Sequence, residues 1–175
     1  SKFLPTDTKK KCLWLDTSTP LPIDVAYKSP NTLGKDRIAA AVGAHELYPN
    51  ENCLVVDIGT CITYEYIDAS GKYYGGGISP GLDMKFKALN TFTANLPLVD
   101  RVEEVPLIGD TTESSIQSGI VNGTVAEIEE IIRMYRDKFS PLRIIMCGGG
   151  SSFIKKRIKS SVEVRQELVL IGLNG

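Results

Sequence analysis

The sequence lacks the features that several classes of protein depend on. Its single histidine has no second imidazole as a partner, and its four cysteines form no C-x-x-C pair, so a zinc site is not expected. No apolar run reaches the roughly 18 residues of a membrane-spanning helix, and no signal peptide is recognisable. A net charge of −1 provides no basic surface for nucleic acid or for an anionic membrane. The composition therefore predicts a cytoplasmic protein with no nucleic-acid or membrane partner.

A Walker loop is also absent, because G-x-x-x-x-G-K-[ST] occurs nowhere in the chain. The most informative segment is instead 55–63, where a short apolar run ends in Asp57 and is followed by Gly59, Thr60 and a second β-prone run at 62–67. This pattern predicts two strands joined by a tight turn. A glycine there lets the backbone approach a ligand, and free N–H groups with threonine hydroxyls can hold phosphate oxygens. The alternative is an ordinary hairpin.

Segments with helical and with strand-like patterns alternate along the chain and predict an α/β fold. The expected strands are 53–56, 62–67, 72–74 and 143–146, and the expected helices are 33–48, 82–96, 111–138 and 152–159. At the start of the longest helix, Asp110 and Glu113 have the spacing of a capping box. The buried stripe of that helix is expected to consist of Ile116, Ile120, Ile128, Ile131 or Ile132, and Tyr135.

Short motifs follow one another along the chain: G-K-D-R at 34–37, D-I-G-T at 57–60, G-G-G-I-S-P-G at 75–81, G-D-T-T-E at 109–113 and C-G-G-G at 147–150. Each is weak alone, but the five in this order and spacing resemble the type III pantothenate kinases, members of the actin-like and sugar-kinase superfamily. The resemblance covers about residues 27–150. It implies an α/β fold of actin-like, ribonuclease-H-type domains, with a mixed sheet flanked by helices.

The resemblance also implies a segment that the sequence does not show. Members of the family have two such domains, and the first begins with a D-x-G-N-T loop that contributes an acidic group for magnesium. No such motif precedes Asp57, so we expect the first domain to be incomplete. Residues 1–50 are then the remainder of the first domain and 51–175 the second. We expect this 175-residue polypeptide to be inactive when alone.

The activity that the resemblance implies is ATP-dependent phosphorylation of pantothenate to 4′-phosphopantothenate, the first step of coenzyme A biosynthesis. ATP with Mg²⁺, a monovalent cation (K⁺ or NH₄⁺) and a homodimer are implied with it. Asp36 matches the proton acceptor of the family's G-x-D-R motif. A carboxylate beside Arg37 is expected to stay ionised, as a base must. The alternative role for Asp36 is that of a first-turn acid stabilised by the helix dipole.

Pantothenate is expected to contact Tyr27, Gly34, Lys35, Arg37 and Thr112. The guanidinium of Arg37 suits the substrate carboxylate, because it donates two parallel hydrogen bonds. Tyr27 matches a substrate-contacting tyrosine of the family, and its alternative is a half-buried structural aromatic. Thr112 matches a threonine that the family supplies across the dimer interface, and its alternative is helix capping alone.

The ATP side is expected to involve Gly59 and Thr60, with Asp57 as the carboxylate that binds the monovalent cation. Residues 148–150 resemble the family's late glycine turn near the nucleotide base, or form a plain strand-to-helix turn. Glu65 stands where an aspartate is common in the family, and no role is assigned to it.

Two other functions stay open beside the kinase. One is a non-catalytic regulatory or binding relative of the kind represented by the Bvg accessory factor. The other is a different small-molecule kinase of the superfamily, although sugar-binding signatures are not evident. The G-x-D-R and D-x-G-T motifs favour the enzyme, because a pure binding protein does not need a base.

Overall fold

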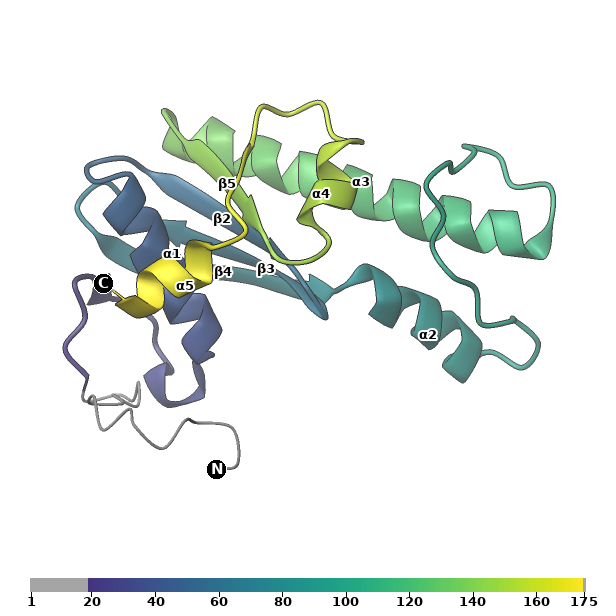
Figure 1. Ribbon diagram of the computed structural model, residues 1–175, viewed down its shortest axis with the longest axis horizontal. Coiled ribbons are helices and arrows are strands. Elements are labelled where there is room, and N and C mark those ends of the chain that lie inside the picture. The colour runs from purple at the N-terminus through teal and green to yellow at the C-terminus, as the bar shows by residue number, and fades with distance from the viewer. Residues whose placement is uncertain (1–18, 175) are drawn as a thin grey trace, which may run out of the picture.

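The computed structural model describes residues 19–174, which form a mixed sheet covered by helices on both faces (Figure 1). The six strands run in the order β1-β4-β3-β2-β5-β6. They are β1 (Asp24–Val25), β2 (Cys53–Ile58), β3 (Cys61–Ile67), β4 (Lys72–Pro80), β5 (Arg143–Cys147) and β6 (Glu163–Val164). Strands β2, β3 and β4 are antiparallel neighbours, whereas β1, β5 and β6 join by parallel pairing. The predicted α/β fold with a mixed sheet is confirmed.

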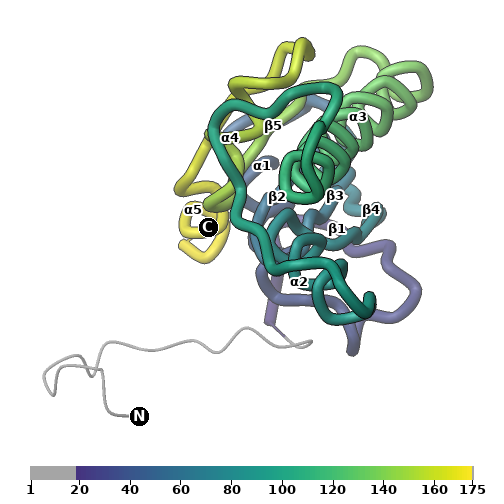
Figure 2. Tube along the Cα trace, turned by 90° about the vertical axis from the view of Figure 1, so that its right-hand side faces the viewer, coloured from purple at the N-terminus to yellow at the C-terminus, as the bar shows by residue number. Residues whose placement is uncertain are grey.

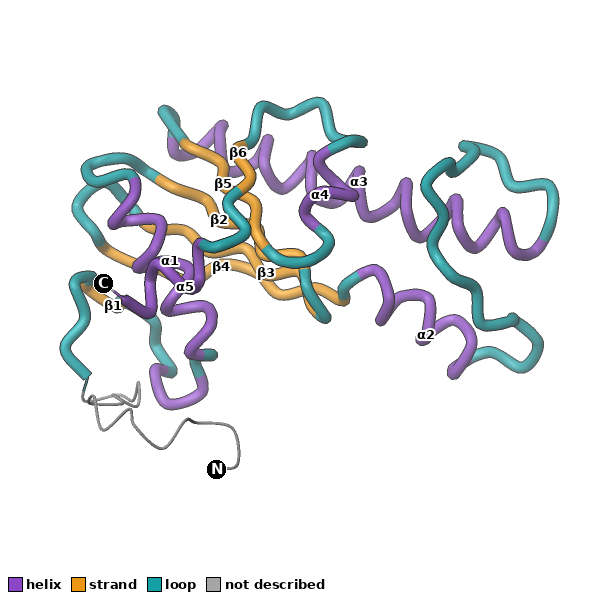
Figure 3. Tube along the Cα trace, in the orientation of Figure 1, coloured by secondary structure: helices purple, strands orange, loops and turns teal. Residues whose placement is uncertain are grey.

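The helices lie in two layers. They are α1 (Lys35–Leu47), α2 (Leu82–Phe92), α3 (Thr112–Phe139), α4 (Ser151–Lys155) and α5 (Leu168–Asn174), with a short 3₁₀ turn η1 (Pro30–Thr32) before α1. Helices α3 and α5 lie on opposite sides of the strands in Figure 2. Helix α2 and the first half of α3 extend beyond the sheet at one end of the molecule (Figure 1). The loop between them runs beside α3 (Figure 3), where the carbonyl of Leu107 accepts the Ser118 hydroxyl at 2.7 Å.

Two hydrophobic clusters, one on each face of the sheet, follow from the alternation of side chains along the strands. Leu54, Val56 and Ile58 of β2 pack with the face covered by α3. Cys53 and Val55 pack with the face covered by α1 and α5. Asp57, two residues after Val55, therefore also faces α1, and so does Glu65, the partner of Val55 in β3.

Helix α1 packs closely against α5 because each helix places a glycine at the contact. A Cβ on Gly43 would lie 2.3 Å from the carbonyl oxygen of Leu168, and a Cβ on Gly172 would lie 1.8 Å from that of Ala39. Any larger side chain would force the two backbones apart. With its alanines also buried, α1 is covered by the sheet on one side and by α5 on another.

Strand β4 is longer than predicted, since it continues through the glycine cluster to Pro80 instead of ending at residue 74. A Cβ on Gly76 would lie 1.9 Å from the carbonyl oxygen of Tyr64, and one on Gly75 would lie 2.6 Å from the ring of Tyr27. The glycines thus allow neighbouring groups to approach the strand, a use of glycine that composition alone does not distinguish from a loop.

The long helix is confirmed, with Ile116, Ile120, Ile128 and Ile132 buried. Its predicted capping box is wrong: Thr111 is the N-cap, and its partner is Ser114 instead of Glu113. The Thr111 hydroxyl accepts the Ser114 N–H at 3.1 Å, and the Ser114 hydroxyl accepts the Thr111 N–H at 2.9 Å. The helix begins one residue later than predicted, so the N3 position moves with it.

Other boundaries also differ from prediction. Helices α2 and α4 end earlier, at Phe92 and Lys155, while β6 and α5 were not predicted. Strand β1 and helix α1, which belong to the predicted remainder of a first domain, pack on the same sheet as the rest. The division at residue 50 stays a prediction. No helix between residues 19 and 174 is both long enough and apolar enough to cross a lipid bilayer.

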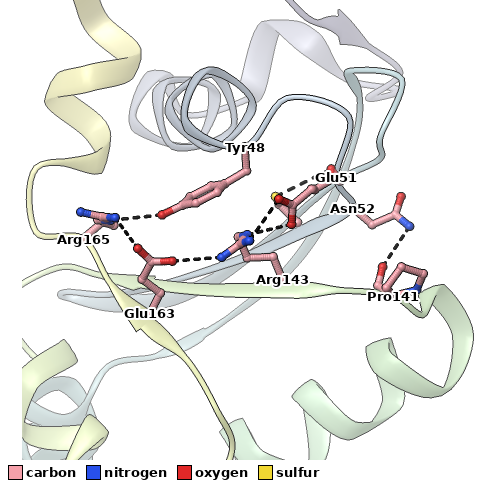
Figure 4. A network of polar contacts seen from close by, with 8 residues as sticks. Tyr48, Glu51, Asn52, Pro141, Arg143, Glu163 and Arg165 are labelled. Carbon is pink, nitrogen blue, oxygen red and sulfur yellow. Dashed lines mark hydrogen bonds and ion pairs between the residues drawn. The ribbon is translucent and has the colours of Figure 1, made fainter.

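A polar network ties the carboxyl-terminal end of α1 to the segment just before β2 and to the first residue of β5 (Figure 4). Arg143 donates to both carboxylate oxygens of Glu51, at 2.8 and 3.0 Å, and to Glu163 at 3.1 Å. Its guanidinium carbon lies 4.2 Å from the centre of the Tyr48 ring. Arg165 pairs with Glu163 and donates to the Tyr48 hydroxyl at 3.1 Å. The opposite ends of β2 and β5 carry the candidate site.

Candidate active site

The predicted turn between β2 and β3 is present and accessible. The Gly59 N–H donates to the carbonyl of Cys61 at 2.9 Å, which closes the turn. Both Gly59 and Thr60 are exposed. The carbonyl of Thr60 accepts the N–H of Gly81 at 3.0 Å, so the end of β4 is fixed against the turn. The turn therefore offers an exposed hydroxyl and a backbone without a bulky side chain, as phosphate binding requires.

A second glycine segment packs against the same turn after β5. Gly148 has a φ of +82°, and a Cβ there would lie 2.2 Å from Oδ1 of Asp57. The N–H of Gly150 donates to the carbonyl of Ile58 at 2.9 Å. Only glycine combines this backbone conformation with such a close approach to a carboxylate. The structure thus brings the two predicted glycine motifs, at 57–60 and 147–150, into contact.

Asp57 lies in a partly buried, acidic setting. Burial raises its pKa above the ordinary aspartate value, and the charges of Asp36 and Glu65 raise it further, while a hydrogen bond from the Cys147 thiol acts in the opposite direction. A bound cation would relieve this repulsion, so the surroundings of Asp57 fit the predicted cation. Between residues 19 and 174, no group of three His, Cys, Asp or Glu side chains is arranged to hold a metal ion together.

Asp36 lies in the first turn of α1 and is exposed. Its Oδ1 accepts the backbone N–H of Arg37 at 3.0 Å. A Cβ on Gly34 would lie 2.5 Å from the same oxygen, so the glycine keeps space open beside the carboxylate. Lys35 is exposed next to it. The structure therefore places an accessible carboxylate close enough to Asp57 for the two charges to interact.

Arg37 is buried and faces Glu65, the residue to which sequence analysis gave no role. Its Nε and Nη2 donate to the two carboxylate oxygens of Glu65 at 2.6 and 2.9 Å. The hydroxyl of Tyr73 donates to Glu65 at 2.5 Å. Burial alone would lower the pKa of Arg37, but the hydrogen bonds and charge of Glu65 outweigh it and raise the pKa. The sequence did contain a signal for this pair. Glu65 lies two residues before Ile67, so both side chains share one face of the strand, and a charged residue on a core-facing position needs a partner.

The expected contact between Arg37 and a substrate carboxylate is constrained by this pair. Glu65 occupies the edge formed by Nε and Nη2, so a second carboxylate would have to approach the Nη1 side. The ring centre of Tyr27 lies 5.5 Å from the guanidinium carbon. Tyr27 also packs over Gly75. The structure thus brings together the predicted residues Tyr27, Gly34, Asp36 and Arg37.

Thr112 is not brought to this group within one chain. It is the first residue of α3, and that end of α3 lies at the opposite end of the molecule from α1 (Figure 1). Thr112 is exposed and lines a surface pocket of about 700 Å³ that also contains Asp110 and Leu96. Because Thr111 supplies the cap, the alternative that Thr112 serves as the N-cap is wrong.

Comparisons with known proteins agree on one family. The family model described as Type III pantothenate kinase matches residues 2–134. A protein of that name from Cytophaga hutchinsonii is 47% identical over 172 residues, which cover 98% of this chain and 73% of the relative. One from Bacteroides fragilis is 45% identical over 162 residues, covering 93% of this chain and 67% of the relative.

A solved structure shows the same fold. It comes from Campylobacter jejuni and is named as a Baf family transcriptional activator; it is 23% identical, with a TM-score of 0.63, covering 87% of this chain and 65% of that chain. At this level of identity the likeness concerns the fold alone. The chain therefore spans about two thirds to three quarters of the length of these proteins.

Proposed function

The chain belongs to the type III pantothenate kinase family, and we propose that it carries the base, the substrate contacts and one phosphate turn of an enzyme that phosphorylates pantothenate with ATP. The product is 4′-phosphopantothenate, at the first step of coenzyme A biosynthesis. The observation that carries the proposal is the accessible carboxylate of Asp36 beside the glycine-rich turn at Asp57. The family match supports the identity of the substrates.

Asp36 is the proposed general base. It accepts the proton of the primary hydroxyl of pantothenate while that oxygen attacks the γ-phosphorus of ATP, and the bond to the β–γ bridging oxygen breaks to release ADP. Its exposure leaves room for the hydroxyl, and Gly34 keeps the adjacent space free. Since phosphoryl transfer depends mainly on position and charge, the fixed first turn of α1 is the main contribution of this segment.

The exposed turn at Gly59 and Thr60 is the proposed contact for ATP phosphates. Asp57 is proposed to hold K⁺ or NH₄⁺. This role is supported by its surroundings, because burial raises its pKa and the negative charges of Asp36 and Glu65 raise it further. Mg²⁺ accompanies ATP and neutralises charge on the phosphates. We assign the reaction to the cytoplasm, where ATP is supplied.

Pantothenate is proposed to lie against Tyr27, Gly34, Lys35 and Arg37. Thr112 is proposed to reach the site from a second subunit of a homodimer, because its own α3 begins at the far end of the molecule from α1 (Figure 1). An exchange of this kind between two copies would give each site a residue from both subunits.

The test is Asp36→Asn in the complete protein. We expect kcat to fall by a factor of about 10² to 10⁴ with ATP affinity nearly unchanged. Asp83→Asn is the matched control, because Asp83 is also an exposed first-turn acid, in α2. If a dipole effect were the whole role of Asp36, the two variants would behave alike. Turnover of Asp36→Asn within about threefold of the wild type contradicts the base assignment.

The kinase is favoured over a non-catalytic regulatory relative and over another small-molecule kinase. The turn, the accessible acid and the buried arginine occur together, and a binding protein needs no base. Phosphopantothenate formation by the complete protein, measured by mass spectrometry with pantothenate and with a panel of sugars, separates these functions. Absence of any phosphorylated product would favour the regulatory role.

A further inference from the structure

The ion pair between Arg37 of α1 and Glu65 of β3 differs from the others in the molecule. Arg37 is 7% exposed and Glu65 is 0% exposed. Among the ion pairs within residues 19–174, it alone has both side chains buried from solvent. Removing two charges from water is costly, and a well-packed apolar pair of similar volume is often at least as stable. Stability is therefore a weak explanation for this pair.

The pair is fully satisfied and rigidly held. Both carboxylate oxygens of Glu65 accept from Arg37, at 2.6 and 2.9 Å, and one of them also accepts the Tyr73 hydroxyl at 2.5 Å. Two parallel bonds fix the guanidinium plane as well as its distance. Tyr73 comes from β4 and Glu65 from β3, so two neighbouring strands of the sheet together hold one residue of α1.

The residue that is held lies next to the proposed base. The N–H of Arg37 donates to Oδ1 of Asp36 at 3.0 Å. Glu65 pairs with Val55 in the β2–β3 register, and Asp57 follows two residues later on the same face of the sheet. Fixing Arg37 to Glu65 therefore fixes the first turn of α1 over the strand that ends in the phosphate turn.

We propose that Glu65 is a positioning residue of the kinase reaction: with Tyr73 it anchors Arg37, sets the place of Asp36 relative to the turn at Asp57, and leaves only the Nη1 side of Arg37 for the substrate carboxylate. This inference rests on the proposed function. A general base depends mainly on its position relative to the substrate hydroxyl. Loss of the anchor is therefore expected to lower kcat/KM for pantothenate and to leave KM for ATP unchanged.

The test compares Glu65→Gln with Glu65→Asp in the complete protein. Glu65→Gln keeps the size but loses the charge and one acceptor. We expect its kcat/KM for pantothenate to fall about tenfold to a hundredfold, with KM for ATP within about twofold of the wild type. Glu65→Asp keeps the charge. We expect its logarithmic decrease in kcat/KM for pantothenate to be no more than half of that of Glu65→Gln. Tyr73→Phe, which removes a single donor, is expected to show a smaller loss of the same kind.

Glu127→Gln is the matched structural control. Glu127 also accepts several hydrogen bonds, from Lys85, Tyr64 and Ser79, but it joins α2 and α3 to the sheet, away from α1. We expect it to lower thermal stability without changing KM for either substrate. All rates are expressed per folded protein, as determined by circular dichroism. If Glu65→Gln does not fold, Glu65→Asp and Tyr73→Phe give the same comparison.

The inference is overturned if the Glu65 and Tyr73 variants keep both pantothenate parameters within about twofold. It is also overturned if the kinetic parameters for ATP and for pantothenate fall by the same factor, or if, as expected for Glu127→Gln, only thermal stability changes. Failure of the proposed function looks different, because the wild-type protein would then form no phosphopantothenate at all.

Discussion

Asp57 of β2 and Cys147 of β5 are partners in a parallel strand pair, so the Cys147 thiol lies close enough to the Asp57 carboxylate for each group to influence the pKa of the other. Cys147 is 1% exposed. Burial raises the pKa of Cys147, and the charge of Asp57 raises it further. Cys147 therefore stays protonated at neutral pH beside the candidate cation ligand.

Cysteine labelling under native conditions tests this arrangement. Burial and the nearby charge of Glu51 raise the pKa of Cys53 to about 12, whereas Cys61 is partly exposed in the turn region. Because the thiolate is the reactive form, iodoacetamide at pH 8 should modify Cys61 at least ~10-fold faster than Cys53 or Cys147. Peptide mass spectrometry over time gives the rates. Equal rates at Cys61 and Cys147 would contradict the burial and the raised pKa of the Cys147 thiol.

The cation proposal predicts a response to K⁺ that depends on Asp57. Potassium should raise the melting temperature and the turnover of the complete protein, and sodium should substitute poorly. Asp57→Asn removes the charge that would bind the ion, so it should abolish the K⁺-dependent shift and lower turnover in K⁺ by about tenfold or more. Differential scanning fluorimetry in K⁺ and Na⁺ buffers of equal ionic strength measures the shift. Identical behaviour in the two salts rules the proposal out.

The half-buried Glu127 predicts a particular pH dependence of stability. Burial alone would raise its pKa, but hydrogen bonds from Lys85, Ser79 and Tyr64 and the charge of Lys85 outweigh burial and lower it. A lowered pKa contributes stability above the ordinary value of 4.5, and that stability is lost as the pH falls through the folded-state value. Glu127→Gln should cost about 1–3 kcal/mol at pH 7 and less at pH 3.

Urea unfolding at the two pH values measures this difference. Glu104→Gln serves as the control, because Glu104 is exposed and its substitution should change stability by no more than about 0.5 kcal/mol. A penalty for Glu127→Gln that is as large at pH 3 as at pH 7 would show that the charge of Glu127 is not what stabilises the fold.

Substitution of Arg143, at the centre of the network in Figure 4, is expected to lower the free energy of unfolding without changing kcat. Arg143 pairs with Glu51 and Glu163 and stacks on Tyr48. Partly exposed ion pairs contribute little each, and stacking adds a comparable amount, so Arg143→Ala should cost about 1–2 kcal/mol. Arg143→Lys, which loses the planar fork, should fall between the alanine variant and the wild type. Chemical denaturation together with kcat checks both, and a kcat changed by more than about threefold would refute the separation of this network from the site.

Local signals in the sequence were sufficient for part of the site. The turn at Gly59 and Thr60 follows from β-prone runs around a glycine, and the first turn of α1 follows from periodicity and a preceding glycine. These features depend on residues that are neighbours in the chain. The sequence therefore predicts where an exposed acid and a phosphate turn occur, although not that they are close together.

The partners of Arg37 were beyond prediction because they depend on tertiary packing. Alternation shows that Glu65 and Ile67 share a face of β3, but the identity of the helix that covers this face is set by the whole sheet. For the same reason, the role of Gly75 and Gly76 in admitting Tyr27 and the Tyr64 carbonyl was not visible. Helix α5 was missed since seven residues without a charged stripe give little periodic signal.

The close contact of Gly43 in α1 with α5 has a consequence for the order of folding. The two helices come from near opposite ends of the described chain, so their contact is among the most non-local in the molecule, and such contacts form late because long loops must close first. During synthesis α1 emerges long before its cover does. The helix that bears Asp36 is thus expected to reach its final place only after the last strand pair has formed, which would make the site one of the last parts of the protein to mature.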